Sequence, residues 1–249
     1  MSDYLVIKDL NKSYKINNRM TPVLQNIDIS IKAGEFISIV GHSGCGKSTL
    51  LKIIAGLVEM DSGAIELDGK IMKGPDIEVG MIFQEHRLFP WLTVKENIGL
   101  NNISKKEKER ITAEHIELVM LTGFENLYPH QISGGMAQKA AIARSLINNP
   151  KLLLLDEPFG ALDALTRLNM QEELLRIWEK EKTTMILVTH DIDEAIYLGD
   201  RTYVMSPRPG TILDIYTINP PKIRNHSDPV NIKIKSDIYA YFSNKVEQK

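Results

Sequence analysis

Residues 36–56 combine a nearly continuous apolar run, a glycine-rich loop and a helical pattern, and this order restricts the fold strongly. The run 36–40 (FISIV) fits a strand that is buried on both faces. It leads into residues 41–48 (GHSGCGKS), which match G-x-x-x-x-G-K-[ST] at every position. A helix is predicted over 47–55, and Gly56 is placed to end it. A strand, a loop and a helix in this order predict an α/β fold around a parallel sheet.

This loop is suited to hold phosphate groups. Glycines let successive backbone N–H groups turn toward an anion, and the helix N-terminus adds the positive end of its dipole. Lys47 would reach the β- and γ-phosphates, and the Ser48 hydroxyl would ligate Mg²⁺. The alternative is a glycine-rich turn that matches by chance, which the flanking strand and helix disfavour. The predicted nucleotide-contacting residues here are Gly41, His42, Ser43, Gly44, Cys45, Gly46, Lys47, Ser48 and Thr49.

A second apolar run, residues 152–155, ends at Asp156 and Glu157. A carboxylate that follows a central strand lies where open α/β sheets bind ligands. Asp156 would hold the Mg²⁺, and Glu157 would orient or deprotonate an attacking water. An acidic pair that merely ends a strand is the alternative, and it is the weaker one beside a phosphate loop. The pair therefore completes a predicted nucleotide-hydrolysing site.

Ser133, Gly134 and Gly135 stand at the start of a predicted helix between these two motifs. A hydroxyl and N–H groups at a helix start can bind an anion. An ordinary N-capped helix is the alternative, and the motif gains weight from its position in the chain.

Six motifs occur in the order found in the ATP-binding subunits of ATP-binding-cassette (ABC) transporters, which the chain resembles over nearly its whole length. The matches are residues 41–48 with the Walker A loop, Gln84 with the Q-loop glutamine, 133–135 with the signature motif, Asp156-Glu157 with Walker B, 161–163 with the D-loop and His190 with the switch histidine. The resemblance implies a P-loop NTPase (RecA-like) α/β core with an N-terminal antiparallel β subdomain and an inserted helical subdomain. We expect one domain over 1–249, the insertion at 86–150, and an irregular C-terminal tail over 216–249 that ends in a short helix.

The resemblance also implies roles for single residues. His190 would contact the γ-phosphate, Gln84 would contact Mg²⁺ or water, and Tyr14 would stack on adenine. Each has a plainer alternative: a histidine satisfied within its own fold, a polar residue after a strand, and a surface aromatic. The implied catalytic residues are Glu157, His190 and Gln84, and the implied Mg²⁺ ligands are Ser48, Gln84 and Asp156.

In this family the signature motif closes over ATP bound to a second copy, so the resemblance implies a head-to-tail homodimer with two composite sites. Met136 stands where the family usually has glutamine, and Ala137 and Lys139 depart from an arginine-rich continuation. Methionine removes an amide donor, whereas Ser133 and the backbone N–H groups remain. We therefore expect ATP hydrolysis to survive the change.

Two segments resemble a branch of importers for nitrate, sulfonate, taurine and related small molecules: residues 83–98 (FQEHRLFPWLTVKENI) and 206–210 (SPRPG). Phe89 and Trp91 would pack in the helical subdomain and shape a groove for the cytoplasmic helix of a membrane permease. The implied partners are permease subunits and, indirectly, an extracytoplasmic solute-binding protein, at the cytoplasmic face of the membrane. A pyrimidine or thiamin-precursor importer is an alternative. A soluble ABC ATPase acting on DNA or ribosomes, and a non-catalytic nucleotide switch, are less favoured.

Composition agrees with these expectations. The chain has 249 residues, 30 lysines and arginines against 32 acidic residues, and a formal net charge of −2. This balance gives no support for a nucleic-acid-binding surface. Cys45 has no partner for a disulfide, and filling the loop is a simpler role for it than redox control. No apolar run approaches the ~18 residues of a membrane span, and no secretory signal is evident. We expect a cytosolic protein that docks on a membrane partner.

Overall fold

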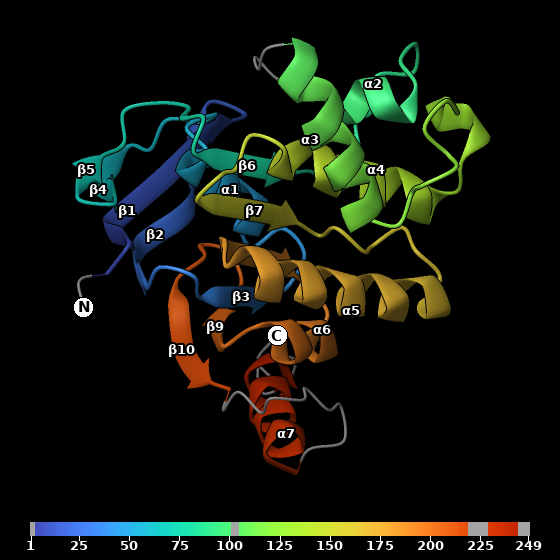
Figure 1. Cartoon of the computed structure of the whole chain (residues 1–249). Helices are drawn as coiled ribbons and strands as arrows, with labels where there is room; N and C mark the ends of the chain where they lie inside the picture. Colours follow the sequence, from blue (N-terminus) through green and yellow to red (C-terminus); the bar gives the residue numbers. More distant parts are fainter. Residues whose placement is uncertain (1–2, 101–104, 219–228, 244–249) are drawn as a thin grey trace. The chain divides into compact units, whose positions relative to one another are not determined.

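The chain forms two compact units (Figure 1). Unit 1 is assembled from two separate segments, Met1–Asp76 and Thr184–Lys249, and unit 2 is the segment between them, Ile77–Thr183. The computed structural model describes residues 3–100, 105–218 and 229–243. No helix within these described ranges has the length and apolar character that crossing a bilayer requires.

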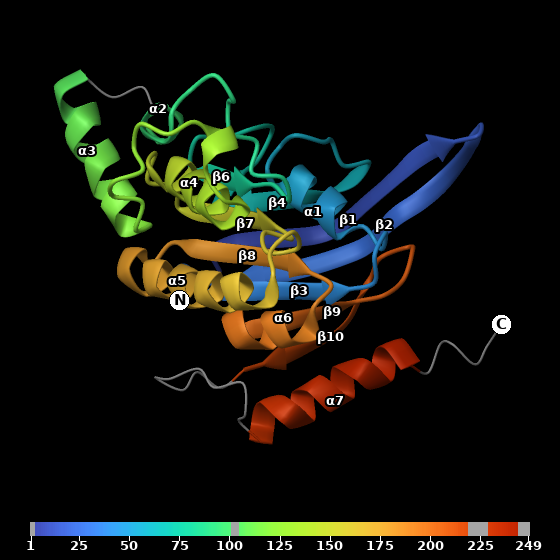
Figure 2. The same cartoon turned by 90° about the vertical axis from the view of Figure 1, so that its right-hand side faces the viewer.

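An antiparallel sheet in unit 1 has the strand order β2-β1-β4-β5. Its strands are β1 (Leu5–Ile16), β2 (Arg19–Ile31), β4 (Ser62–Leu67) and β5 (Lys70–Ile71). Strands β1 and β2 form a long hairpin (Figure 2), with Asn17 and Asn18 at positive φ values of 48° and 62° in the turn. Asparagine tolerates this conformation well, which suits it to a two-residue hairpin turn. The predicted N-terminal antiparallel sheet is confirmed.

A parallel arrangement in unit 1 carries the phosphate loop. Strand β3 (Phe36–Gly41) lies between β8 (Thr184–Thr189) and β9 (Arg201–Met205) and pairs in parallel with both, and β10 (Ile212–Thr217) is antiparallel to β9. Every residue of β3 and β8 is buried, as expected of strands covered on both faces. Helices α1 (Lys47–Ile54) and α6 (Ile192–Leu198) contact this pair of strands. The predicted α/β core with parallel strands is thereby confirmed.

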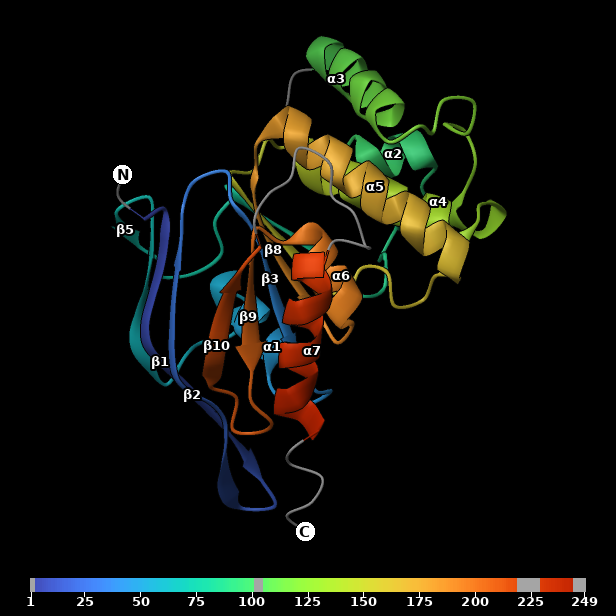
Figure 3. The ribbon, with the colours of Figure 1, turned by 90° about the horizontal axis from the view of Figure 1, so that it is seen from below.

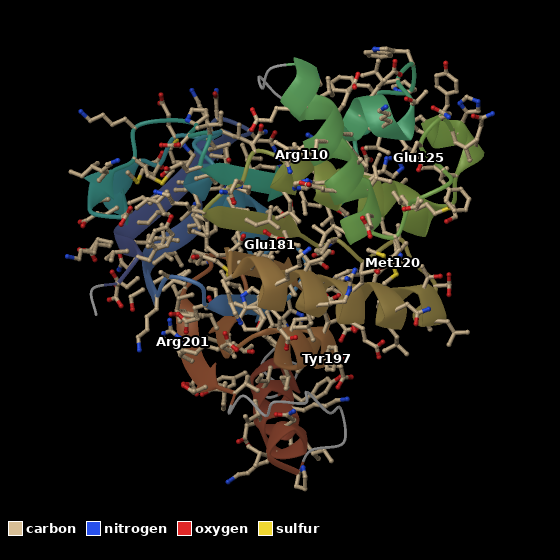
Figure 4. The ribbon with its side chains drawn as sticks, viewed as in Figure 1. Arg110, Met120, Glu125, Glu181, Tyr197 and Arg201 are labelled. Carbon is tan, nitrogen blue, oxygen red and sulfur yellow. The ribbon has the colours of Figure 1, made fainter. Side chains whose placement is uncertain are left out.

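Arg201 links the two sheets of unit 1 (Figure 4). Its Nη2 donates to the Ser30 carbonyl at 2.6 Å and to Glu35 Oε2 at 2.8 Å. The Glu35 carboxylate raises the pKa of the guanidinium above its ordinary value. Arg201 of β9 therefore holds the end of β2 through the Ser30 carbonyl and the turn after β2 through a charge-assisted fork to Glu35.

Helix α7 (Pro229–Ser243) replaces much of the irregular tail that the sequence predicted. Ile234 and Ile238 pack with Ile196 and Val204 in one buried cluster, and Figure 3 shows α7 beside β9 and α6. The tail is therefore part of the core of unit 1.

Unit 2 contains a parallel pair of strands and all the remaining helices. Strands β6 (Val79–Ile82) and β7 (Leu152–Asp156) pair with Ile82 opposite Leu155. The helices are α2 (Val94–Ile98), α3 (Lys105–Leu118), the 3₁₀ helix η1 (Pro129–Gln131), α4 (Gly134–Leu146) and α5 (Ala164–Glu181). Every described element between residues 86 and 150 is a helix, and Figure 1 shows α2, α3 and α4 gathered together.

Candidate functional site

Glycines shape the loop between β3 and α1. Gly44 and Gly46 have φ values of +77° and +114°, a region that residues with a side chain rarely adopt. A Cβ on Gly46 would also lie only 2.7 Å from Leu24 Cδ2. The Cys45 N–H donates to the His42 carbonyl at 3.2 Å and closes the turn. The loop conformation thus requires glycine both for its backbone and for close approach to β2.

Lys47 lies inside the curve of this loop. Its side chain is buried, and Nζ donates to the carbonyl oxygens of Gly41 at 2.7 Å and His42 at 3.1 Å. Two carbonyls of the same loop therefore fix the ammonium at the start of α1. The predicted contact of Lys47 with phosphate groups stays a prediction, and the structure shows that the ammonium is held inside the loop.

His190 and Tyr14 belong to the same unit as the loop. In the parallel register Thr189 lies opposite Val40, so His190 leaves β8 at the level where Gly41 begins the loop. The His190 side chain is exposed. Tyr14 pairs with Thr21 on the hairpin, two residues from Val23, whose carbonyl lies beside Gly46. Both residues therefore come from elements that border the phosphate loop.

Gln84 and Glu157 belong to unit 2 and leave its paired strands at equivalent positions. Each comes two residues after the paired residues Ile82 and Leu155. Gln84 Nε2 lies 3.8 Å from the position that a Cβ on Gly160 would take, so its amide reaches the turn that follows Glu157. Glu157 has φ = +44°, a rare backbone conformation that clusters at functional sites. Asp156 is buried at the end of β7.

The signature residues cap helix α4. Ser133 Oγ accepts a hydrogen bond from the Met136 N–H at 3.3 Å, which is the N-cap arrangement. Ser133 and Gly134 are exposed, whereas Gly135 is buried. A Cβ on Gly135 would lie 2.8 Å from Thr166 Cγ2 at the start of α5. Ser133 therefore serves as an ordinary helix N-cap, and Ser133 and Gly134 remain exposed.

The three predicted Mg²⁺ ligands are divided between the units: Ser48 lies in unit 1, and Gln84 and Asp156 lie in unit 2. A hydroxyl, an amide oxygen and a carboxylate are hard oxygen donors of the kind that bind Mg²⁺ together with nucleotide phosphates. Among the described residues, no cluster of three or more His, Cys, Asp and Glu side chains is placed to hold a metal. Each of the three side chains therefore offers an oxygen donor of the kind that Mg²⁺ accepts.

Two contacts of the loop were not foreseen from the sequence. Arg208 donates to the Gly44 carbonyl through Nε at 3.2 Å and Nη2 at 2.9 Å. The Phe242 ring of α7 meets the His42 ring edge-on, with centroids 4.7 Å apart. Arg208 lies in the SPRPG segment, which the sequence marked only by resemblance. No local signal pointed to Phe242, because its contact depends on how α7 packs.

Comparison with known proteins agrees with this geometry. The family model described as "ABC transporter" matches residues 24–160, a range that runs from β2 through the phosphate loop to the turn after Glu157. The chain belongs to the ABC transporter family. An aliphatic sulfonates import ATP-binding protein of Bacillus subtilis (strain 168) is 50% identical over 93% of this chain and 91% of its own length. The bicarbonate transport ATP-binding protein of Synechococcus elongatus is 45% identical over 98% of this chain and 39% of its own length.

Solved structures of ABC cassettes have the same fold as this chain. A dimeric ATP-binding cassette in a post-hydrolysis state, bound to ADP and Pi, superposes with a TM-score of 0.76 at 32% identity, over 87% of this chain and 100% of that chain. The protein cbiO1 from Clostridium perfringens, which is part of the ABC transporter complex cbiONQ, superposes with a TM-score of 0.78 at 26% identity, over 87% of this chain and 89% of that one. This chain is an ATP-binding subunit of an ABC transporter, and its chemistry is ATP hydrolysis.

Proposed function

We propose that this chain powers an importer of a small solute, with aliphatic sulfonates as the favoured solutes. The observation that carries this proposal is the 50% identity over 93% of the chain to an aliphatic sulfonates import ATP-binding protein. Bicarbonate is the second candidate, because a bicarbonate transport ATP-binding protein is 45% identical over 98% of the chain. Nitrate and taurine belong to the same group of small anionic or zwitterionic solutes.

The proposed reaction converts ATP and water into ADP and phosphate. Loop N–H groups and Lys47 would bind the β- and γ-phosphates and balance their charge. Bound through Ser48, Gln84 and Asp156, Mg²⁺ would supply further charge neutralisation. Glu157 would take a proton from the attacking water. Catalysis of this kind consists mainly of positioning and charge stabilisation.

Gln84 and His190 would act beside the γ-phosphate. The amide of Gln84 reaches the turn after Glu157, which is where an attacking water would be oriented. His190 directly follows the last residue of β8. The pairing of β8 with β3 places it at the level where the phosphate loop begins. The proposal gives His190 the polar contact to the γ-phosphate and Tyr14 the stacking contact to adenine.

A homodimer would complete the site. Ser133 and Gly134 are exposed at the N-terminus of α4, and we assign them to ATP that is held by the phosphate loop of a second copy. Related cassettes have been solved as dimers, one of them bound to ADP and Pi. Two copies in this arrangement would hold two equivalent ATP molecules.

The permease would dock on unit 2 at the cytoplasmic face of the membrane. Phe89 and Trp91 precede α2, with 41% and 69% of their surfaces exposed, and their ring centroids are 5.3 Å apart. Exposed aromatic pairs of this kind favour contact with an amphipathic helix. An extracytoplasmic solute-binding protein would select the solute, and no nucleic acid is involved.

Growth on single nutrients tests the solute assignment. A strain that lacks this chain should lose growth on an aliphatic sulfonate as sole sulfur source and keep growth on sulfate. The wild-type chain should restore growth, and the Glu157→Gln variant should not. Unimpaired growth on sulfonates, together with a defect on limiting bicarbonate or on nitrate, would reassign the solute and leave the ATPase role intact.

A further inference from the structure

The turn that follows β9 touches the phosphate loop at two consecutive carbonyls. Arg208 donates to the Gly44 oxygen through Nε at 3.2 Å and Nη2 at 2.9 Å. Gly210 lies against the next carbonyl, because a Cβ there would be 2.4 Å from the Cys45 oxygen. This segment, residues 206–210, lies outside the range 24–160 that the family model matches.

Gly210 also joins the turn to β2. Its N–H donates to the Val23 carbonyl at 2.8 Å, and its own carbonyl accepts from the Gln25 N–H at 3.0 Å. Val23 in turn borders Gly46 of the loop. The turn therefore connects β2 to the phosphate loop by hydrogen bonds on one side and by close packing on the other.

Ser206 holds the turn in shape. Its N–H donates to the Thr211 carbonyl at 2.9 Å, and its Oγ accepts from the Thr211 N–H at 2.9 Å. The same hydroxyl donates to the Pro209 carbonyl at 2.9 Å. Arg208 therefore lies in a turn that is closed by its own hydrogen bonds. This fixes the backbone from which its side chain extends.

One peptide plane connects Arg208 to Lys47. The peptide between Gly44 and Cys45 presents its C=O to Arg208, and its N–H donates to the His42 carbonyl at 3.2 Å. That His42 oxygen also accepts from Lys47 Nζ at 3.1 Å. Since the C=O and N–H of a trans peptide point in opposite directions, fixing one fixes the other.

We propose that Arg208 is a positioning residue for nucleotide binding, which holds the Gly44 carbonyl on the outer side of the phosphate loop. This contact sets the orientation of the peptide before Cys45 and the carbonyl that receives Lys47. In the described part of the chain Arg208 forms no ion pair with a carboxylate, so its hydrogen bonds go to the loop. The inference rests on the proposed binding of ATP by this loop.

Three variants separate this role from others. We expect Arg208→Gln to raise the Kd of ATP and of ADP by about tenfold each, because both nucleotides use the same loop, while kcat at saturating ATP stays within about twofold. Arg208→Lys should raise both Kd values by about threefold, because lysine keeps the charge but lacks the planar fork. Arg176→Gln is the matched control, since Arg176 donates to the Leu118 carbonyl in unit 2. It should leave both affinities unchanged.

Affinities are measured by calorimetry on full-length protein whose melting temperature without nucleotide matches the wild type. Unchanged affinities in Arg208→Gln would overturn the proposal. A lower kcat at unchanged Kd in Arg208→Gln, or a loss of affinity for ATP but not for ADP, would also overturn it. The same holds for wild-type affinity in Arg208→Lys and for an equal loss of affinity in Arg176→Gln. Wild-type protein that binds no ATP would refute the proposed function itself. Wild-type protein that binds ATP without supporting import leaves the Arg208 test valid.

Discussion

Lys47 is the residue on which ATP binding depends most directly. Its buried ammonium is held by the carbonyls of Gly41 and His42, so it enters the site already oriented. We expect Lys47→Ala to weaken ATP binding at least a hundredfold, about 2.8 kcal/mol, and to abolish hydrolysis. Calorimetry and phosphate release measure the two effects. Hydrolysis near the wild-type rate would contradict the role of the loop, provided that circular dichroism shows the variant folded.

Glu157 is expected to contribute to chemistry and not to affinity. Glu157→Gln is close to isosteric, so ATP binding should persist, and phosphate release should fall by a factor of about 10² to 10⁴ because the general base is lost. Glu172→Gln makes the same chemical change on the exposed side of α5 and should leave the rate unchanged. Equal rates in the two variants would remove Glu157 from the mechanism.

Cys45 gives a test that depends on pH. Burial raises the pKa of its thiol, although nearby Lys47 acts in the opposite direction. The folded chain therefore binds the thiol proton more tightly than the unfolded chain, and this contribution to stability is lost as the pH rises above the ordinary thiol pKa. We expect the iodoacetamide labelling rate of native protein to go on rising with pH after the rate of urea-unfolded protein has levelled off, because the folded thiol ionises at higher pH. Labelling rates that level off at the same pH in both states would show an ordinary thiol.

At the scale of elements, Asn97 anchors the segment that leads from Gln84 to α2. Its side chain is fully buried, Oδ1 accepts from the Phe89 N–H at 2.8 Å, and Nδ2 donates to the carbonyls of Phe89, Leu92 and Thr93 at 3.0–3.1 Å. The amide supplies both a donor and an acceptor to this loop. The geometry of the loop from Phe89 to Thr93 therefore depends strongly on this side chain.

We expect Asn97→Ala to lower the free energy of unfolding by about 2–3 kcal/mol, because several buried backbone groups lose their partner. Asn97→Asp should cost more, since it places a carboxylate oxygen opposite backbone carbonyls. Urea denaturation measures both. Asn126→Ala, at an exposed site in the same unit, should stay within about 0.5 kcal/mol. An Asn97→Ala variant as stable as this control would refute the anchoring role.

Elements whose signal is local could be predicted from the sequence. The apolar runs of β3, β7 and β8 are strands buried on both faces, and the loop at 41–48 is contiguous, so each carries its own pattern. Strand β9 could not be placed, because its pairing with β3 is long-range, and the place of β10 in the sheet depends on β9, its hairpin partner. The contact of Arg208 with Gly44 spans 164 positions in the sequence and has no local signature.

At the scale of the whole molecule, the composite site predicts that ATP joins two copies. Glu157→Gln should run as a dimer with ATP and Mg²⁺ and as a monomer with ADP in size-exclusion chromatography with light scattering. Unhydrolysed ATP would then bridge one phosphate loop and the partner's signature motif. A monomer at all concentrations, with ATP bound and the permease present, would contradict the shared site.

Gly134 offers a matched control for this dimer. A Cβ there would meet only Leu162 Cδ2, at 4.0 Å, and Gly134 is exposed, so a larger side chain fits the monomer. We expect the double variant Glu157→Gln, Gly134→Arg to bind ATP and remain monomeric, because arginine would obstruct the approach of the second copy. A stable dimer of this double variant would exclude the N-terminus of α4 from the interface.

The divided construction of unit 1 has a consequence for synthesis on the ribosome. Strand β3 emerges early, yet its neighbours β8 and β9 are translated about 150 residues later. At about 5–20 residues per second this delay is on the order of ten seconds. The hairpin β1–β2 and the contiguous unit 2 can form from contacts within their own segments meanwhile. The nascent chain therefore carries an apolar, unpaired β3 through much of its elongation, which makes it a natural client for chaperones, and the phosphate loop gains its supporting strands only near the end of translation.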